Sequence, residues 1–400
     1  MKSKTPQLRF KGFDEVWDQT HLSQYLTTST LKNKDNTFAK EDVLSVSREF
    51  GVVNQMEFQG RSFAGASLLG YGVASNRDII YTKSPLRDQP YGIIKTNKGE
   101  AGIVSALYAI YSPKDNIDPD FIQVYFDDDE RLNNYLRPIV RKGAKNTLNV
   151  SDDDALSGNV VFPQKIEQSM MVKMFCYLDD RITKQNSKCQ KLLKLKDCLI
   201  ESLFIFGEDS RLNSKNEAFP LRMTGDNVFA PVSEKGYPEL PILSASQELG
   251  MIPRAENGID MSYGTANIDG YKRVLPNQFV IHLRSFQGGF AHSSIEGITS
   301  PAYTVMRFKE PEKQDPVYWK YLLTSAWFVK ELAKVTYGIR DGKSIKFDDF
   351  AKMEFCIPEK DKQHEIAEIL EELSDLIRLN NQKLEKLRQL KSALLDIMFV

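Results

Sequence analysis

Hydrophobic residues recur at heptad spacing in two long stretches of the chain, residues 163–204 and 358–399. In each stretch they form an a/d seam with Lys and Glu beside it, which is typical of a helix that pairs with another helix. A proline begins each stretch, and the first turn of a helix tolerates proline. The pattern predicts one long helix at 163–205 and another at 358–400. The residues predicted to pair them are Leu178, Ile182, Gln185, Leu192 and Leu199 in the first, and Leu373, Ile377, Asn380, Leu387 and Leu394 in the second.

The two stretches are copies of one another. A shift of 195 residues aligns them without a gap, and fourteen positions are identical. Polar residues interrupt the seam at two matched places, Gln185 with Asn380 and Lys196 with Lys391. Because a polar residue in such a seam costs stability but fixes the register, we expect antiparallel helices with Gln185 opposite Asn380. The alternative is that the two helices pack on separate domains without pairing.

The repeat continues upstream of the helices. The strand-like segment 44–51 is echoed at 243–250, and an Asp-Pro helix start at Asp118 is echoed at Asp315. The helix after Asp118 is predicted to run toward Leu136. Mixed strand and helix patterns in each half predict an α+β fold, with two similar α/β domains, two long helices that pair as an antiparallel coiled coil, and a pseudo-two-fold internal repeat. The predicted boundaries are 1–162 and 206–357 for the domains, and 163–205 and 358–400 for the helices.

Composition narrows the class of protein. With 400 residues, 41% hydrophobic and 27% charged, the chain is expected to be soluble and to form two or three domains. It has no apolar run long enough to cross a membrane. Net charge is −1, which argues against a dedicated non-specific nucleic-acid binder but leaves a local basic face possible. The four cysteines lack metal-type spacing, so we expect free thiols in a reducing cytoplasm.

The sequence offers no convincing catalytic centre. Gly338–Ser344 resembles a phosphate-binding loop but has three residues between its glycines instead of four. Asp118-Pro119 and Asp315-Pro316 resemble the Asp-Pro-Pro-Tyr element of enzymes that methylate DNA amino groups, yet they lack the second proline and suit helix starts. The four histidines are scattered, and the acidic runs 127–130 and 152–154 are interpreted as solvated faces or helix caps. We therefore expect no catalytic, cofactor-binding or metal site.

Basic residues, by contrast, recur beside loops in both halves. Arg and Lys neutralise phosphates, and Arg can also bond guanine edges with two hydrogen bonds. For any single residue an ordinary surface charge is the alternative, and only the recurrence favours DNA binding. The candidates are Arg48, Arg61, Lys83, Arg87, Arg141, Lys142 and Lys145 in the first half, and Lys272, Arg273, Arg284, Arg340 and Lys343 in the second.

Several short motifs accompany the duplicated layout: Pro6–Phe13 with Trp17, Arg77–Tyr81, Phe286–Gly289, Gly297–Tyr303, and the helix starts Phe162-Pro163 with Gln168 and Ile357-Pro358 with Gln363. Together, these motifs and the layout resemble the DNA-specificity subunit of type I restriction–modification systems. The resemblance covers essentially the whole chain. It departs from the family pattern near 206–230, where Phe219–Met223 stands in place of a clear Leu-Arg-Phe start.

The resemblance implies a non-catalytic subunit that binds double-stranded DNA. Each globular domain would be a target-recognition domain for one half of a split, asymmetric site. The partners would be two methyltransferase subunits, which would hold S-adenosylmethionine, and restriction subunits that move and cut DNA. Two alternatives remain at this point. One is a scaffolding protein with two protein-binding domains on a coiled coil, and the other is a methyltransferase that acts alone.

Overall fold

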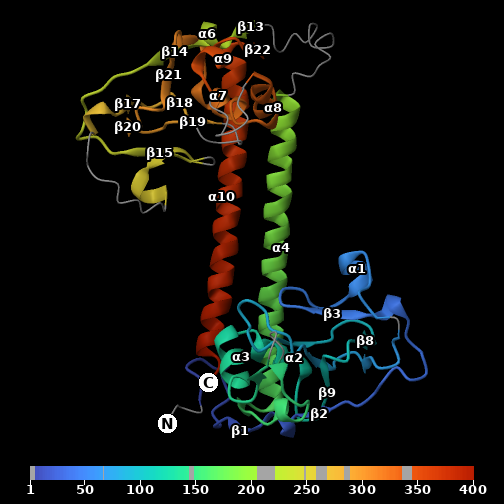
Figure 1. Cartoon of the computed structure of the whole chain (residues 1–400). Helices are drawn as coiled ribbons and strands as arrows, with labels where there is room; N and C mark the ends of the chain where they lie inside the picture. The colour runs from blue at the N-terminus through green and yellow to red at the C-terminus, as the bar shows by residue number, and fades with distance from the viewer. Residues whose placement is uncertain are drawn as a thin grey trace. The chain divides into compact units, whose positions relative to one another are not determined.

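The computed structural model describes residues 5–65, 67–143, 148–204, 221–246, 249–257, 268–282, 289–335 and 345–400. The chain divides into two compact units, residues 1–186 with 382–400, and residues 187–381 (Figure 1). The divisions fall inside the two long helices, α4 (Lys165–Phe204) and α10 (Lys360–Ile397). Each unit therefore contains one globular domain, the first part of the helix that follows it, and the last part of the other helix.

An antiparallel four-stranded sheet forms the centre of the first unit. Its order is β2 (Leu26–Thr28), β9 (Ala109–Pro113), β6 (Ile79–Tyr81) and β7 (Ile94–Thr96). Further antiparallel pairs are β1 (Asp18–His21) with β12 (Asn159–Phe162), β3 (Leu44–Ser47) with β4 (Gly51–Asn54), β5 (Gly72–Ala74) with β8 (Gly102–Val104), and β10 (Arg141–Lys142) with β11 (Leu148–Asn149). A short helix α1 (Gln55–Gln59) follows β4.

The second unit repeats this topology. Its four-stranded sheet has the order β14 (Phe229–Val232), β21 (Thr304–Phe308), β18 (Phe279–Ile281) and β19 (Phe290–His292). The matching pairs are β13 (Leu221–Thr224) with β22 (Glu354–Ile357), β15 (Leu243–Ser246) with β16 (Gly250–Pro253), and β17 (Lys272–Val274) with β20 (Gly297–Thr299). Its shorter helices are α6 (Gly225–Val228), α7 (Pro316–Leu322), α8 (Ala326–Val335) and α9 (Phe347–Ala351). The predicted α+β fold with an internal repeat is confirmed.

One predicted element is wrong. The helix expected from Asp118 to Leu136 is two helices, α2 (Pro119–Phe126) and α3 (Asp129–Leu136). Asp128 is the cause, because its backbone is extended and its carboxylate accepts a hydrogen bond of 2.6 Å from the backbone N–H of Arg131. An N-cap of this kind begins a new helix.

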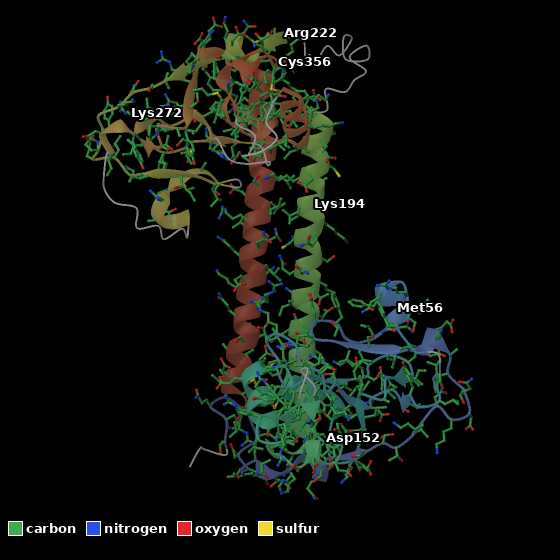
Figure 2. All side chains as sticks on the ribbon, in the orientation of Figure 1. Met56, Asp152, Lys194, Arg222, Lys272 and Cys356 are labelled. Atoms are coloured by element: carbon green, nitrogen blue, oxygen red, sulfur yellow. The ribbon has the colours of Figure 1, made fainter. Side chains whose placement is uncertain are left out.

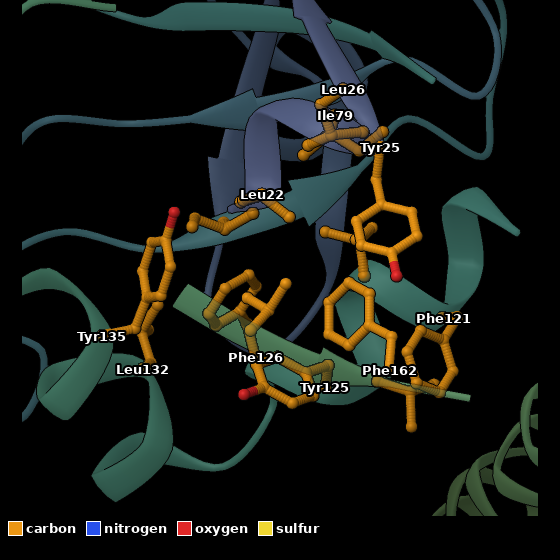
Figure 3. Close-up of a cluster of buried hydrophobic side chains, with 14 of the residues drawn as sticks. Leu22, Tyr25, Leu26, Ile79, Phe121, Tyr125, Phe126, Leu132, Tyr135 and Phe162 are labelled. Carbon is orange, nitrogen blue, oxygen red and sulfur yellow. The ribbon is translucent and has the colours of Figure 1, made fainter. Parts of the chain in front are cut away.

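An aromatic core joins the sheet, α2 and both long helices in the first unit. Figure 3 shows the part of this core around Tyr25, Phe121 and Phe162. Phe162, at the end of β12, is fully buried, and its ring centroid lies 4.9 Å from Tyr25 and 5.1 Å from Phe121. Burial of a side chain of this size contributes about 1.5–3 kcal/mol. Phe399, after the end of α10, packs 5.7 Å from Phe121.

The second core is built in the same way. Phe204, the last residue of α4, packs with its ring centroid 5.4 Å from Tyr318 of α7. Phe204 and Phe399 are one of the identical pairs in the repeat, so the end of each long helix inserts a phenylalanine into the domain of the other half. Phe175 of α4 packs 5.9 Å from Phe399, while Asp179 of α4 contacts Lys391 of α10. The residue number on α4 rises from 175 to 179 while that of its partner falls from 399 to 391, so the two helices pack antiparallel in this unit.

Candidate DNA interface and helix attachments

The two Asp-Pro elements are helix starts in the structure. Asp118 is the N-cap of α2, with its carboxylate accepting from Asp120 N at 3.1 Å. Asp315 is the N-cap of α7 and accepts from the backbone N–H groups of Val317 and Tyr318 at 2.8 and 2.9 Å. Each proline stands in the first turn of its helix, where no backbone N–H is needed. The capping carboxylates are thus occupied by structural bonds.

A buried glutamine attaches each long helix to its own domain. Gln168, fully buried on α4, accepts from Asp118 N at 2.9 Å and donates to the Pro163 carbonyl at 2.8 Å. Gln363 on α10 repeats this with Asp315 N and the Pro358 carbonyl, both at 3.0 Å. The identity of Gln168 and Gln363 across the repeat therefore has a structural reason, which is to join the helix start to the Asp-Pro turn.

A cluster of charges attaches the other long helix to the first domain. We call it the Asp127 cluster. Its centre is Asp127, between α2 and α3, whose carboxylate lies 2.6 Å from Lys95 Nζ on β7 and 3.2 Å from Lys391 Nζ on α10. Lys391 Nζ also lies 2.7 Å from Asp179 Oδ1 on α4. The cluster consists of Arg48, Lys95, Asp127, Asp129, Asp179 and Lys391.

Opposite charges control protonation in this cluster. Burial alone would raise the pKa of the Asp127 carboxyl, but Lys95 and Lys391 outweigh it and hold that pKa below its ordinary value. Burial lowers the pKa of Lys95, and Asp127 compensates only in part. For Lys391 burial also opposes the charge, yet Asp127 and Asp179 raise its pKa above the ordinary value. Lys391 therefore remains a cation between two carboxylates.

A cleft of about 510 Å³ lies beside the cluster. The β3–β4 turn, with Arg48 and Phe50, lines one part of it, and Asp179 and Arg388 of the long helices line another. Arg48 connects the β3–β4 turn to the α2–α3 turn in the wall of this cleft, because its guanidinium donates to the Asp127 carbonyl at 2.9 Å and to Asp129 Oδ1 at 2.7 Å. The acidic run 127–130 was interpreted as a solvated face or a helix cap. Asp128 is such a cap, but Asp127 is about 10% exposed and a solvated face is wrong for it.

The matched lysine in the second unit has a different environment. Lys196 of α4 lies with Nζ 5.1 Å from the ring centroid of Tyr321 on α7. The nearby carboxylate of Glu371 bonds Lys320 Nζ at 2.8 Å and also accepts from the Tyr321 hydroxyl at 2.9 Å. Burial and the positive charge of Lys320 lower the pKa of Lys196. Each seam-breaking lysine thus contacts the domain of the other half, through carboxylates in one unit and an aromatic ring in the other.

The DNA-binding candidates of the first half fall into three groups. Arg48 belongs to the Asp127 cluster, and Lys83 Nζ lies 2.6 Å from Asp152 Oδ1 (Figure 2). Arg61 and Lys142 are exposed and rest against the rings of Phe63 and Tyr91, at 4.5 and 5.1 Å. Within the described part of the chain, the exposed Arg87 and Arg141 make no ion pair.

In the second half, two candidates lie side by side on β17. Arg273 pairs with Glu296, with Nε 2.8 Å from Oε1, and its guanidinium lies 4.3 Å from the Tyr237 ring centroid. Lys272 (Figure 2) donates to the Tyr303 carbonyl at 2.6 Å, and burial lowers its pKa. The candidates Lys145, Arg284, Arg340 and Lys343 lie outside the described residues.

The predicted seam positions are covered to different degrees. Leu178, Gln185, Ile377 and Asn380 are buried. The remaining six are half-buried: Ile182, Leu192, Leu199, Leu373, Leu387 and Leu394. The Asn380 amide donates to the Leu376 carbonyl of its own helix at 2.6 Å. Gln185 lies in the first unit and Asn380 in the second, and their pairing stays a prediction.

Sequence reasoning missed Lys95 and Glu167 altogether. Neither residue lies in a motif that the sequence singles out, yet Lys95 is buried, and Glu167 is buried in a two-bond pair with Arg9 at 2.7 and 3.0 Å. The useful signal was a charge at a position that should be apolar, as in the strand Ile94–Thr96. Among the described residues, no group of three or more His, Cys, Asp or Glu side chains is placed to hold a metal ion. No helix in those ranges is both long and apolar enough to cross a membrane.

Comparisons with known proteins agree with this architecture. The family model of the type I restriction modification DNA specificity domain matches residues 241–389. The crystal structure of the type I restriction–modification system S subunit from M. genitalium is similar, with a TM-score of 0.59 and 13% identity over 99% of both chains. A chain from a structure on complex assembly and conformational transition of the type I R-M system has a TM-score of 0.54 and 15% identity, over 95% of this chain and 96% of that one. No curated protein sequence matches the chain. At these identities the structural likeness establishes the fold.

Proposed function

We propose that this chain is the sequence-recognising subunit of a type I restriction–modification complex, a proposal supported by the match of residues 241–389 to the family model of the type I restriction modification DNA specificity domain. Each globular domain recognises one half of a split, asymmetric site in double-stranded DNA. The observation that supports this most strongly is the repeat itself. The two units share the order of their strands, yet the sequences of the two globular domains differ from one another more than those of the two long helices do. A common scaffold with different surfaces suits two different half-sites.

The long helices would set the distance between the half-sites. Helix α4 has 40 residues and α10 has 38, which at about 1.5 Å per residue is about 60 and 57 Å. Half-sites one turn apart on a duplex are separated by about 34–36 Å, so a pair of helices of this length is sufficient as a spacer. Deletion of one heptad from both helices should change the spacer that is tolerated. An unchanged spacer in a methylation assay would refute this role.

The same helices would recruit the partner subunits. On α4, Ile166, Met170 and Tyr177 are exposed and lie on one face, and on α10 the exposed Ile369 and Leu376 are one heptad apart. Exposed apolar rows of this kind favour protein partners. We propose that the partners are two methyltransferase subunits, which hold S-adenosylmethionine, and restriction subunits for cleavage. The chain itself would carry out no methyl transfer, and purified alone it should transfer none.

The basic candidates can be ranked by what they would lose on binding. Arg87 and Arg141 are exposed and without an ion pair within the described residues, so they can contact phosphates at little cost. Arg48, Lys83 and Arg273 would first have to leave carboxylates. Replacing Arg87 or Arg141 by alanine should reduce the slope of log affinity against log salt by about 0.9 for each lost phosphate contact. An unchanged slope would exclude the residue from the interface.

Methylated-adenine mapping across a genome that expresses the complex tests the proposal directly. The expected result is one bipartite motif with a fixed spacer. Exchange of residues 1–162 for the domain of a relative should then change only one half of that motif. A scaffolding protein, the alternative class, would bind specific and random DNA equally at every salt concentration. If the methyltransferase partner is present and no sequence preference is found, the proposal is wrong.

A further inference from the structure

Lys391 stands where the apolar seam of α10 should continue, and its ammonium group reaches two other elements of the first unit. Its Nζ lies 3.2 Å from Asp127 Oδ2 and 2.7 Å from Asp179 Oδ1. The Lys391 side chain is only 19% exposed and that of Asp127 10%. A lysine in such a place has given up most of its hydration, so the two carboxylates are what keep it charged.

This contact is directional, whereas the aromatic part of the attachment of α10 is not. Phe399 holds the helix end through rings at 5.7 Å from Phe121 and 6.3 Å from Trp17, contacts that tolerate small shifts. The Arg131 guanidinium of α3 donates to the Leu395 carbonyl at 2.8 Å, which fixes the same turn of α10 next to α3 (Figure 1). Lys391 adds a bond to α4 and a bond to the α2–α3 turn from one atom. The Lys391 ammonium group therefore fixes the positions of α4, α10 and the α2–α3 turn relative to one another.

The rest of the cluster extends this registration to the remainder of the domain. Lys95 connects the same Asp127 carboxylate to the central sheet, and Arg48 connects the α2–α3 turn to the β3–β4 turn. The charges balance, with three cations and three carboxylates. The largely buried members, Lys95, Asp127 and Lys391, cost stability against apolar replacements but select one arrangement among several. The side chains are Arg48, Lys95 and Lys391 with Asp127, Asp129 and Asp179.

We propose that Lys391 is a positioning residue for DNA recognition: it fixes the first target-recognition domain on the helix pair, and so fixes where the first half-site must lie. The inference rests on the proposed function and names a part of it that the fold alone does not give. Although Lys391 is among the last residues of the chain, it acts on the half-site recognised by residues 1–162. Lys196, held by the Tyr321 ring at 5.1 Å, does this more weakly for the second domain.

The test uses the full chain with its methyltransferase partner and synthetic duplexes. The duplexes carry the bipartite site mapped for the wild-type complex, with the natural spacer or with one base pair added or removed. Lys391→Met keeps the length of the side chain without its charge, Lys391→Arg restores the charge, and Asp179→Asn removes one partner at a half-exposed position. Glu167→Gln is the matched control, because it breaks the buried pair with Arg9 in the same unit without touching α10.

The quantity measured is the ratio of kcat/KM on the natural spacer to that on the altered spacers. We expect Lys391→Met to lower this ratio about tenfold, since small errors of placement cost methylation rates of this order. Lys391→Arg should restore it to within about twofold and Asp179→Asn should lower it in part, while Lys196→Met should lower it less than Lys391→Met. Glu167→Gln should leave the ratio unchanged even where thermal stability falls.

Two results would overturn the inference. One is an unchanged ratio in both Lys391→Met and Asp179→Asn, and the second is an equal fall in Glu167→Gln, which would mean that any loosening of the unit suffices. If Lys391→Met does not fold, Asp179→Asn with Lys391→Arg decides the question alone. A wild-type complex that methylates DNA without a bipartite site would instead refute the proposed function, so the two failures are distinguishable.

Discussion

Replacement of Gln168 by alanine should loosen the first unit at a defined place. Gln168 is fully buried, and it satisfies the Asp118 N–H and the Pro163 carbonyl at 2.9 and 2.8 Å. Alanine leaves both backbone groups buried without a partner, at about 1–3 kcal/mol each, so the expected loss is about 2–6 kcal/mol. Gln363→Ala should have a similar effect in the second unit, where the corresponding distances are 3.0 Å.

Hydrogen exchange followed by mass spectrometry is the suitable assay, because a chain with two compact units need not unfold in one step. Peptides over α2 and over the β12–α4 junction should exchange about 30-fold faster or more in Gln168→Ala, since each 1.4 kcal/mol is a factor of ten. Peptides of the second unit should be unchanged. Gln164→Ala is the control, because Gln164 is exposed and, within the described ranges, its amide bonds Glu15 alone.

Three outcomes would refute this reasoning. The first is a loss below about 1 kcal/mol in Gln168→Ala, which would mean that other groups satisfy the Asp118 N–H and the Pro163 carbonyl. The second is an equal effect of Gln164→Ala, which should remain within about 0.5 kcal/mol. The third is uniform acceleration across both units, which would show that the glutamine acts on the whole chain and not on the helix start.

Further predictions concern packing, charge and pH. A Cβ at Gly102 would lie 2.4 Å from the Asp42 carbonyl oxygen, so Gly102→Ala should lower the urea midpoint by an amount equivalent to about 1–3 kcal/mol, and wild-type stability would contradict that contact. Arg9→Gln leaves the Glu167 carboxylate buried and unpaired and should cost about 3–5 kcal/mol by thermal unfolding, and a loss below 1 kcal/mol would show that Glu167 is otherwise satisfied. Burial lowers the pKa of His292 from 6.5 to about 4, so the unfolded chain protonates this residue more readily than the folded chain does. The free energy of unfolding should therefore fall as pH falls from about 6.5 to about 4, by up to about 3 kcal/mol. His292→Phe should remove that part of the acid sensitivity in urea titrations at pH 7 and pH 4.5, and an unaltered difference would exclude His292 as its source.

The sequence was sufficient for the repeat, the two long helices and the α+β class, because periodicity and identity at a shift of 195 residues are local signals. It was insufficient at the break between α2 and α3, where three successive aspartates look alike. Only Asp128 takes the extended backbone of an N-cap, and only Asp127 turns into the protein, where it meets two lysines. The DNA candidates were chosen by residue type alone, and type does not distinguish exposed Arg87 from Arg48 in an ion pair.

The pattern of identities within the repeat separates attachment from recognition. Gln168 with Gln363, and Phe204 with Phe399, occupy matched positions and make matched contacts, one at the start of each long helix and one at its end. Lys391, although identical to Lys196 in type, bonds a carboxylate 264 residues away in sequence, and no periodicity could predict that partner. These glutamines and phenylalanines keep their identity in both halves because the two joints that they form have the same geometry. The basic loops are under no such constraint and can differ between the halves. Under the proposed function these loops contact the DNA, whose sequence differs between the two half-sites.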